Sequence, residues 1–194
     1  MKNLETQTVE KQKSFDVSAW IGKGINWKAY IGACKKNVGR MERIYERVSI
    51  PEEAFRYFES KDISRVICIA EDWCPDCVQN VPMLVRLFEH FPQIILKLYF
   101  RDDNVYLIQH YLTNGKKVIP TVVFFDERLN ELGRWAGPSR KAKKWTQDTL
   151  IKGRRIEEIP RDEIESFGRL YDEKFLTEFY RNSLEELEAV LAQK

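Results

Sequence analysis

The chain has 194 residues, 43% of them hydrophobic, which is enough for the core of one ordinary domain with extensions. The formal net charge is only +2, and the basic residues gather at 139–155 ahead of an acidic C-terminal segment. This pattern predicts solvated helix faces, and a nucleic-acid or anionic-surface site is the alternative. No apolar run of about 18 residues occurs, so we expect no membrane span, and the polar arm at 1–13 lacks the apolar region of a secretory signal.

Two helices are predicted before the first strand. Apolar residues step by three and four along residues 27–48, which predicts one helical face, and Asn26 is placed to cap it. Ser49 and Glu52 have the spacing of a capping box. They predict a second, shorter helix that runs through Phe58.

The following segments alternate between strand and helix patterns. Short, nearly continuous apolar runs are typical of strands that are buried on both faces. The predicted order is strand 65–70, helix 78–90, strand 94–100, helix 102–112, strand 118–125, strand 131–135 and helix 138–153. A right-handed crossover makes the first two strands parallel, and the short turn at 126–130 makes the last two an antiparallel hairpin.

After Pro160 the sequence is helical again. An aromatic stripe at helical spacing predicts a long helix, and it consists of Phe167, Tyr171, Phe175 and Phe179. Ser183 and Glu186 have capping-box spacing, which predicts that a separate final helix starts there. We interpret the stripe as packing, with the face of a homodimer as the alternative.

Two of the four cysteines, Cys74 and Cys77, form a Cys-x-x-Cys pair between a predicted strand and a predicted helix. This spacing puts both sulfurs on the first helical turn and is typical of a redox dithiol. Cys34 and Cys68 add no disulfide framework, so we expect a reducing cytoplasm. Half of a Zn or Fe–S site is the alternative, but neither the histidines nor the other cysteines have matching spacing, so we expect no metal.

The sequence around the pair predicts different roles for the two sulfurs. Cys74 is expected to be the exposed N-cap of the helix, where backbone N–H groups and the helix dipole lower its pKa. Pro75 at the first helical position loses no hydrogen bond. Asp72 and Asp76 oppose this lowering, but we expect Asp76 on the solvent side, where its charge is screened. Cys77, more buried, is predicted to resolve the mixed disulfide.

The order of elements and several residues resemble the thioredoxin family over residues 50–152. The resemblance rests on Trp73 before the dithiol, Pro82 five residues after Cys77, the Ile119-Pro120-Thr121 run that matches the family's cis-proline loop, and Gly137 near its substrate-groove glycine. The Trp-Cys-Pro-Asp-Cys sequence is similar to that of the thioredoxin-related protein subgroup.

The resemblance implies an α/β fold with a thioredoxin-like central mixed β-sheet flanked by helices at 50–153. Residues 1–49 and 154–194 would then be helical extensions at the two ends. Cys74 and Cys77 would be catalytic, and no cofactor is implied beyond their redox-active disulfide. The residues that would support the substrate groove are Trp73, Pro75, Asp76, Ile119, Pro120 and Gly137.

One position departs from the family pattern. Thioredoxins carry a buried Asp six residues before the first active cysteine, and here that position is Cys68, which we interpret as a core residue. Glu71 and Lys97 are the candidates for the missing proton transfer. Strand alternation, however, points Glu71 to the opposite face.

We therefore predict a cytoplasmic thiol–disulfide oxidoreductase that reduces disulfides in proteins or small thiols and contributes to cell redox homeostasis. Its electron donor would be a thioredoxin reductase or a low-molecular-weight thiol. The alternative from another class is a non-catalytic thioredoxin-fold interaction module that acts through its helical extensions. A third reading, metal binding, predicts that the purified protein retains metal.

Overall fold

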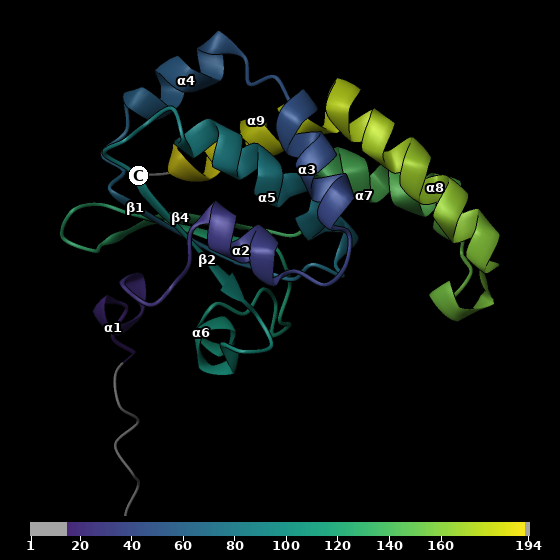
Figure 1. The fold of residues 1–194 in the computed structure, drawn as a ribbon, viewed down its shortest axis with the longest axis horizontal. Helices are drawn as coiled ribbons and strands as arrows, with labels where there is room; N and C mark the ends of the chain where they lie inside the picture. The colour runs from purple at the N-terminus through teal and green to yellow at the C-terminus, as the bar shows by residue number, and fades with distance from the viewer. Residues whose placement is uncertain (1–14, 193–194) are drawn as a thin grey trace, which may run out of the picture.

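A computed structural model describes residues 15–192, so the arm expected at 1–13 lies outside the described residues. One sheet forms the centre of the protein, and helices pack around it (Figure 1). Its strands are β1 (Arg65–Ala70), β2 (Ile95–Phe100), β3 (Thr121–Phe125) and β4 (Glu131–Ala136), in the spatial order β2-β1-β3-β4. β1 pairs with β2 in parallel, and β3 is antiparallel to both β1 and β4. The predicted mixed sheet and its terminal hairpin are therefore confirmed.

Nine α-helices lie in the described part of the chain, together with two π-helical turns and one 3-10 turn. The α-helices are α1 (Ser18–Ile21), α2 (Trp27–Ala33), α3 (Val38–Arg47), α4 (Glu52–Glu59), α5 (Pro75–Phe88), α6 (Val105–His110), α7 (Arg140–Thr146), α8 (Arg161–Lys174) and α9 (Tyr180–Leu191). The π turns are η1 (Gln147–Ile151) and η3 (Phe175–Phe179), and the 3-10 turn is η2 (Ile156–Glu158). None of the described helices is long and apolar enough to cross a membrane.

The prediction of one helix over residues 27–48 is wrong, because the chain breaks between α2 and α3. The backbone N–H groups of Lys35 and Lys36 donate to Asp72 Oδ2, at 2.6 and 2.9 Å, instead of continuing the helix. Asn37 then takes a left-handed conformation, with φ of 56°. The predicted cap of the first helix is correct, since the Asn26 side chain accepts from the N–H of Ala29.

Both predicted capping boxes are also wrong. Pro51 is the N-cap of α4, and no side chain caps that helix. At the C-terminus, α8 continues through the π turn η3 into α9, so Ser183 lies inside a helix. Glu186 does not cap its own helix, because its carboxylate accepts from Trp135 Nε1 at 3.0 Å and from the N–H of Arg140 at 2.8 Å.

Several predicted boundaries shift. The helix predicted at 78–90 is α5 (Pro75–Phe88), and the one predicted at 102–112 is the shorter α6 (Val105–His110). The helix expected at 138–153 begins at Arg140, with Ser139 as its N-cap, and its second half is the π turn η1. The third strand begins at Thr121 rather than at 118, because the preceding residues form a loop with a cis peptide bond between Ile119 and Pro120.

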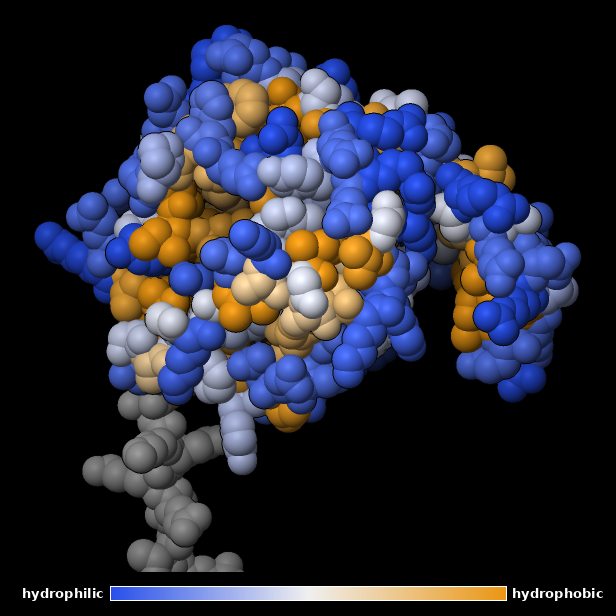
Figure 2. Space-filling model, in the orientation of Figure 1, coloured by the Kyte–Doolittle hydropathy of each residue, from blue (hydrophilic) through white to orange (hydrophobic). Residues whose placement is uncertain are grey.

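Side chains from before, within and after the sheet contribute to the hydrophobic core. Buried side chains from α2 and α3, from the sheet and from α8–α9 form one hydrophobic cluster. α9 packs on β4 so closely that a Cβ at Gly133 would lie 2.7 Å from the carbonyl oxygen of Val190. The helices before and after the sheet therefore share its core. The N-terminal half of α8 projects from this body, with hydrophobic side chains on the side of the projecting arm that faces the body (Figures 1 and 2).

Candidate active site

The dithiol lies at the junction between the C-terminal end of the central strand β1 and the start of α5. Cys74 is the N-cap of α5 with an extended backbone, and Pro75 is the first helical residue, as predicted. The N–H of Val78 donates to the carbonyl of Cys74 at 3.0 Å, which closes the first turn. Cys77 lies within this turn, so both sulfurs are at the N-terminal end of the helix.

Cys74 is more enclosed than the sequence suggested. We expected an exposed N-cap, but only 6% of Cys74 is accessible, and Cys77 is fully buried. The reason is the loop before β3, which comes from a distant part of the chain. The Cys74 thiol donates to the carbonyl oxygen of Ile119 across 3.6 Å, so this loop covers one side of the sulfur.

The two thiols differ in acidity. The pKa of Cys74 is lowered, first by a hydrogen bond from Cys77 and then by the backbone N–H groups of Cys77 and Asp76. Burial and the charge of Asp76 oppose this lowering. The pKa of Cys77 is raised well above its usual value, mainly by burial and then by its contact with Cys74. Cys74 is therefore the readily formed thiolate, and Cys77 stays protonated beside it.

Asp76 does not lie on the solvent side, which corrects the sequence-based expectation. Its side chain is half-buried, and Oδ1 accepts a hydrogen bond of 3.1 Å from the hydroxyl of Tyr171 in α8. Burial raises the pKa of Asp76 to about 6, although the Tyr171 hydrogen bond works in the opposite direction. The helix after the sheet therefore reaches the residue between the two cysteines.

The next residue of α8 reinforces this contact. Asp172 accepts two hydrogen bonds from the guanidinium of Arg40, at 2.7 and 2.9 Å, and one of 3.0 Å from Gln79 Nε2 in α5. This cluster joins α3, α5 and α8 one turn beyond the dithiol. The sequence pattern does not predict Arg40, Gln79 or Asp172 as site residues, and it predicts Tyr171 as packing, with a homodimer face as the alternative. No local signal marks these residues, since Asp172 and Gln79 are 93 positions apart.

The predicted groove residues come together around the sulfurs. The peptide bond between Ile119 and Pro120 is cis, and the carbonyl of Pro120 accepts from the N–H of Gly137 at 2.8 Å. Gly137 has φ of 86°, a conformation that favours glycine. Trp73 is 41% exposed, and the Arg101 guanidinium lies over its ring at 4.8 Å. Trp73, Ile119 and Pro120 thus border the dithiol.

The two candidates for proton transfer are placed differently. Glu71 is buried and accepts from the N–H of Asp102 at 2.8 Å, and burial raises its pKa. Lys97 pairs with Ile67 in the sheet, three residues before the carboxyl end of β1, so it lies roughly 10 Å from that end along the strand. The structure therefore keeps Glu71 near the motif and does not bring Lys97 to the dithiol.

The other two cysteines, Cys34 and Cys68, are not part of the dithiol. All four cysteines are free thiols, and burial raises the pKa of Cys68 to about 12. The pKa of Cys34 is also raised to about 12, by burial and by the charges of Asp72 and Glu71. Within residues 15–192, no group of three His, Cys, Asp or Glu side chains is arranged to hold a metal ion.

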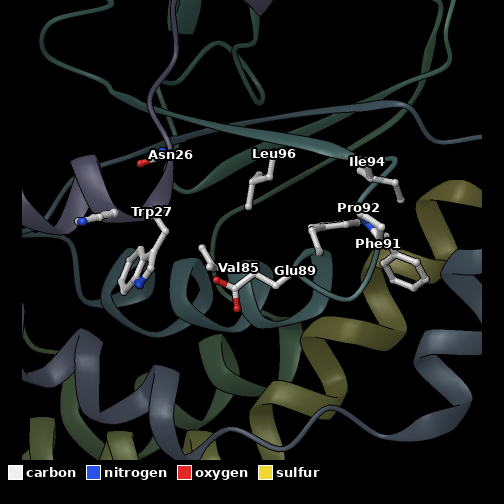
Figure 3. Close-up of a pocket in the computed structure, with 10 residues that line it drawn as sticks. Asn26, Trp27, Val85, Glu89, Phe91, Pro92, Ile94 and Leu96 are labelled. Carbon is white, nitrogen blue, oxygen red and sulfur yellow. The ribbon is translucent and has the colours of Figure 1, made fainter.

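A pocket of about 420 Å³ lies at the other end of α5 (Figure 3). Its lining includes Trp27 from α2, Val85 from α5 and Leu96 from β2. Val85 follows Cys77 by eight residues on the same helix, so the pocket is about 12 Å along the axis from the dithiol. It is separate from the sulfur chemistry.

Two solved structures share this architecture over most of the chain. A structure of an HIV epitope scaffold aligns with a TM-score of 0.64 and 16% identity, covering 91% of this chain and 98% of that one. A protein of unknown function from Pseudomonas aeruginosa aligns with a TM-score of 0.63 and 17% identity, covering 90% and 96%. Thioredoxin O1 from Arabidopsis thaliana aligns with a TM-score of 0.35 and 20% identity, covering 50% and 86%. None of the curated proteins compared with the chain matches it.

The first two likenesses show a shared fold that extends over nine tenths of the chain. A family model described as Thioredoxin matches residues 24–150, which is more than half of the chain. The match begins within residues 1–49, the segment predicted as an N-terminal extension. It includes β1, the dithiol, the cis-proline loop and the terminal hairpin. The chain belongs to the thioredoxin family.

Proposed function

We propose that this protein is a cytoplasmic thiol–disulfide oxidoreductase that reduces disulfides in proteins or small thiols. The observation that carries the proposal is the opposite acidity of two neighbouring sulfurs at the start of α5. The pKa of Cys74 is lowered and that of Cys77 is raised, and each acts on the other. Family membership supports the same chemistry.

The reaction follows from these two pKa directions. The Cys74 thiolate attacks one sulfur of the substrate disulfide, which forms a mixed disulfide and releases the first substrate thiolate. Cys77 then loses its proton and attacks the Cys74 sulfur. The second substrate thiolate leaves and takes up a proton, so the substrate gains two electrons and the protein is left with a Cys74–Cys77 disulfide. An electron donor, either a thioredoxin reductase or a low-molecular-weight thiol, returns the protein to the dithiol.

The surroundings of Cys74 favour a substrate that approaches along the surface beside Trp73 and the Ile119–Pro120 peptide. The exposed Trp73 ring offers an apolar contact, and Ile119 already provides the carbonyl that accepts from the Cys74 thiol. An extended substrate chain placed there would present its sulfur to the part of Cys74 that stays accessible. The reducing compartment is proposed because the number and spacing of the cysteines offer no disulfide framework beyond the dithiol.

Two cysteine variants test this function. Cys74→Ser is expected to abolish reduction of a disulfide-linked reporter, and Cys77→Ser is expected to retain the first attack and accumulate mixed disulfides with substrates. Cys34→Ser serves as the matched control, because it removes a thiol from the end of α2 and leaves the dithiol intact. A Cys74→Ser protein that reduces the reporter as fast as the wild type would refute the proposal. The reduction potential of the Cys74–Cys77 couple, compared with the redox potential of the cytoplasm, would show whether the protein reduces or oxidises its substrates.

A second function, a binding module, is favoured by one observation. The arm that carries the N-terminal half of α8 projects from the body (Figure 1). Exposed large apolar side chains in or next to α8 are Ile156, Ile164 and Leu170. Such a surface suits a protein partner or a second copy of this chain. If binding is the only function, the purified protein shows negligible turnover in the reporter assay and a mass above 23.1 kDa in light scattering.

A further inference from the structure

The hydroxyl of Tyr171 connects the C-terminal helix α8 to the dithiol motif. It donates a hydrogen bond of 3.1 Å to Asp76 Oδ1. Asp76 lies in the first turn of α5, two residues after Cys74 and directly before Cys77. Two peptide units separate the Cα atoms of Asp76 and Cys74 by no more than about 7 Å. The carboxylate that Tyr171 holds is therefore close to the sulfur that attacks the substrate.

The side chain of Tyr171 is fixed in its position. Its ring is buried and stacks on the rings of Trp145 and Phe167, with centroids 5.9 and 5.6 Å away. The next residue, Asp172, is bound to α3 and α5 through the three hydrogen bonds described above. These contacts fix α8 against α5, so the Tyr171 hydroxyl is a preorganised donor to Asp76.

The hydrogen bond favours the ionised form of Asp76, because a hydroxyl donates more strongly to a carboxylate than to a neutral acid. Burial raises the pKa of Asp76 to about 6, and the hydrogen bond from Tyr171 opposes a further rise. Tyr171 itself keeps its proton, since burial and then the charge of Asp76 raise the pKa of this phenol far above its usual value. At pH 7 the carboxyl of Asp76 is therefore mainly ionised.

A negative charge in this position disfavours the Cys74 thiolate. The hydrogen bond from Cys77 lowers the pKa of Cys74, and the charge of Asp76 opposes that lowering. The Cys74 thiolate exists only in the reduced protein, so the charge destabilises the reduced form relative to the disulfide. A dithiol with a less stable reduced form gives up its electrons more readily, whereas a stabilised reduced form makes a strong oxidant.

We propose that Tyr171 is a positioning residue that keeps the Asp76 carboxylate ionised beside Cys74 and thereby biases the dithiol toward the reduction of its substrates. The inference rests on the proposed function and adds to it the direction of the reaction and a role for α8. Tyr171 acts through Asp76 and takes no part in the making or breaking of bonds. With oxidised glutathione as the substrate, the dithiol gives up two electrons and two protons. The Cys74–Cys77 bond forms, and two molecules of reduced glutathione leave.

The test compares Tyr171→Phe, Asp76→Asn and the double variant with the wild type, all as full-length proteins. The first measurement is the pH profile of iodoacetamide alkylation, followed on the Cys74 peptide by mass spectrometry. Asp76→Asn is expected to lower the midpoint by about one unit, because a nearby like charge is removed. Tyr171→Phe is expected to lower it by about half a unit, because Asp76 is then only partly neutral near pH 7.

The double variant shows whether Tyr171 acts through Asp76. Its midpoint is expected to equal that of Asp76→Asn, because residue 76 then carries no charge for the hydroxyl to stabilise. Tyr45→Phe is the matched control, since its hydroxyl bonds to Glu89 near the far end of α5, and its midpoint is expected to equal that of the wild type.

The second measurement is the equilibrium of each protein with reduced and oxidised glutathione at pH 7. The equilibrium constant for reduction of oxidised glutathione is expected to fall about twofold in Tyr171→Phe and about threefold in Asp76→Asn, as midpoint shifts of this size imply. A purely structural role of Tyr171 would change stability and leave this constant unchanged.

The pH profile is read against the other titratable and charged groups that face Asp76 or the dithiol. These are Cys77 in α5, Asp172 in α8 with its partner Arg40 from α3, Cys68 in β1, and Glu71 after β1. All of them are present in the wild type and in every variant, so the differences report on Tyr171 and Asp76.

The outcomes separate this inference from the proposed function. A Tyr171→Phe protein with the wild-type midpoint and glutathione equilibrium overturns the role of Tyr171, and so does a further shift in the double variant. An unchanged midpoint in Asp76→Asn also overturns it, whether or not Tyr171→Phe folds. If the wild-type protein reduces neither oxidised glutathione nor the disulfide-linked reporter, the proposed function itself fails.

Discussion

Replacement of Asp76 by Asn is the most direct test of how the C-terminal helix affects the dithiol. Burial raises the pKa of this carboxyl to about 6, from an ordinary value of 3.8. A carboxyl whose pKa is higher in the folded state favours folding most below the unfolded-state pKa. That advantage is lost as pH rises through the folded-state value. Asp76 therefore destabilises the fold above about pH 6, and Asn at this position, which never ionises, does not.

The size of the effect follows from the two pKa values. A difference of about two pKa units corresponds to an upper limit of about 3 kcal/mol, and partial relaxation around the charge lowers the expected gain to about 1–3 kcal/mol. The gain should appear between about pH 4 and pH 6 and stay constant above that range. Loss of the Asp76 charge should also lower the pKa of Cys74, because this charge opposes formation of the thiolate.

Urea unfolding of the reduced proteins from pH 5 to pH 8 measures the first effect, and the pH dependence of iodoacetamide alkylation measures the second. Asp148→Asn is the control, since Asp148 is an exposed carboxylate paired with Lys144 on the surface. A free-energy difference between Asp76→Asn and wild type that is the same at pH 5 and pH 8 would refute the reasoning. Slower alkylation of Cys74 in the variant would refute the second part.

Two further predictions concern the contacts that hold the site. Arg40→Ala is expected to destabilise the protein by about 2–4 kcal/mol in urea unfolding, because it leaves the largely buried Asp172 without its bidentate partner. Arg47→Ala, which breaks an exposed ion pair, should cost less than about 1 kcal/mol, and equal losses would contradict this account. Gly137→Ala is expected to lower stability by about 1–2 kcal/mol, because φ is 86° there. Gly32 lies inside α2 with open space around it, so Gly32→Ala should stabilise the protein by up to about 1 kcal/mol. A Gly137→Ala protein as stable as the wild type would argue against strain at position 137.

Local patterns predicted the framework of the site well. The apolar run before the dithiol is β1 with the expected bounds, and Cys74 is the N-cap of the helix that follows. The periodicity of a strand or a helix depends only on nearby residues, so it can be recognised in each segment by itself. The same reasoning failed for the capping boxes at Ser49 and Ser183, because a short motif competes with distant hydrogen-bond partners for the same side chains.

Other features depend on pairs of residues that are far apart in the sequence. Asp76 contacts Tyr171 across a separation of 95 residues. Asp72 accepts hydrogen bonds after the end of α2 from the backbone N–H groups of Lys35 and Lys36, which precede it by 37 and 36 positions. Neither contact is visible in the pattern of either segment. They reverse two expectations, namely the solvent-side position of Asp76 and the single helix over residues 27–48.

The Cys-x-x-Cys pair, its place between strand and helix, and the family resemblance are properties of the sequence alone. They determine that two thiols share the first turn of a helix, because that geometry is local. Only the tertiary structure decided how the site is enclosed: the loop carrying Ile119 covers one side of Cys74, and Tyr171 donates a hydrogen bond to Asp76. Burial and hydrogen bonding between distant segments set the acidity of each sulfur, and a linear pattern does not contain that information.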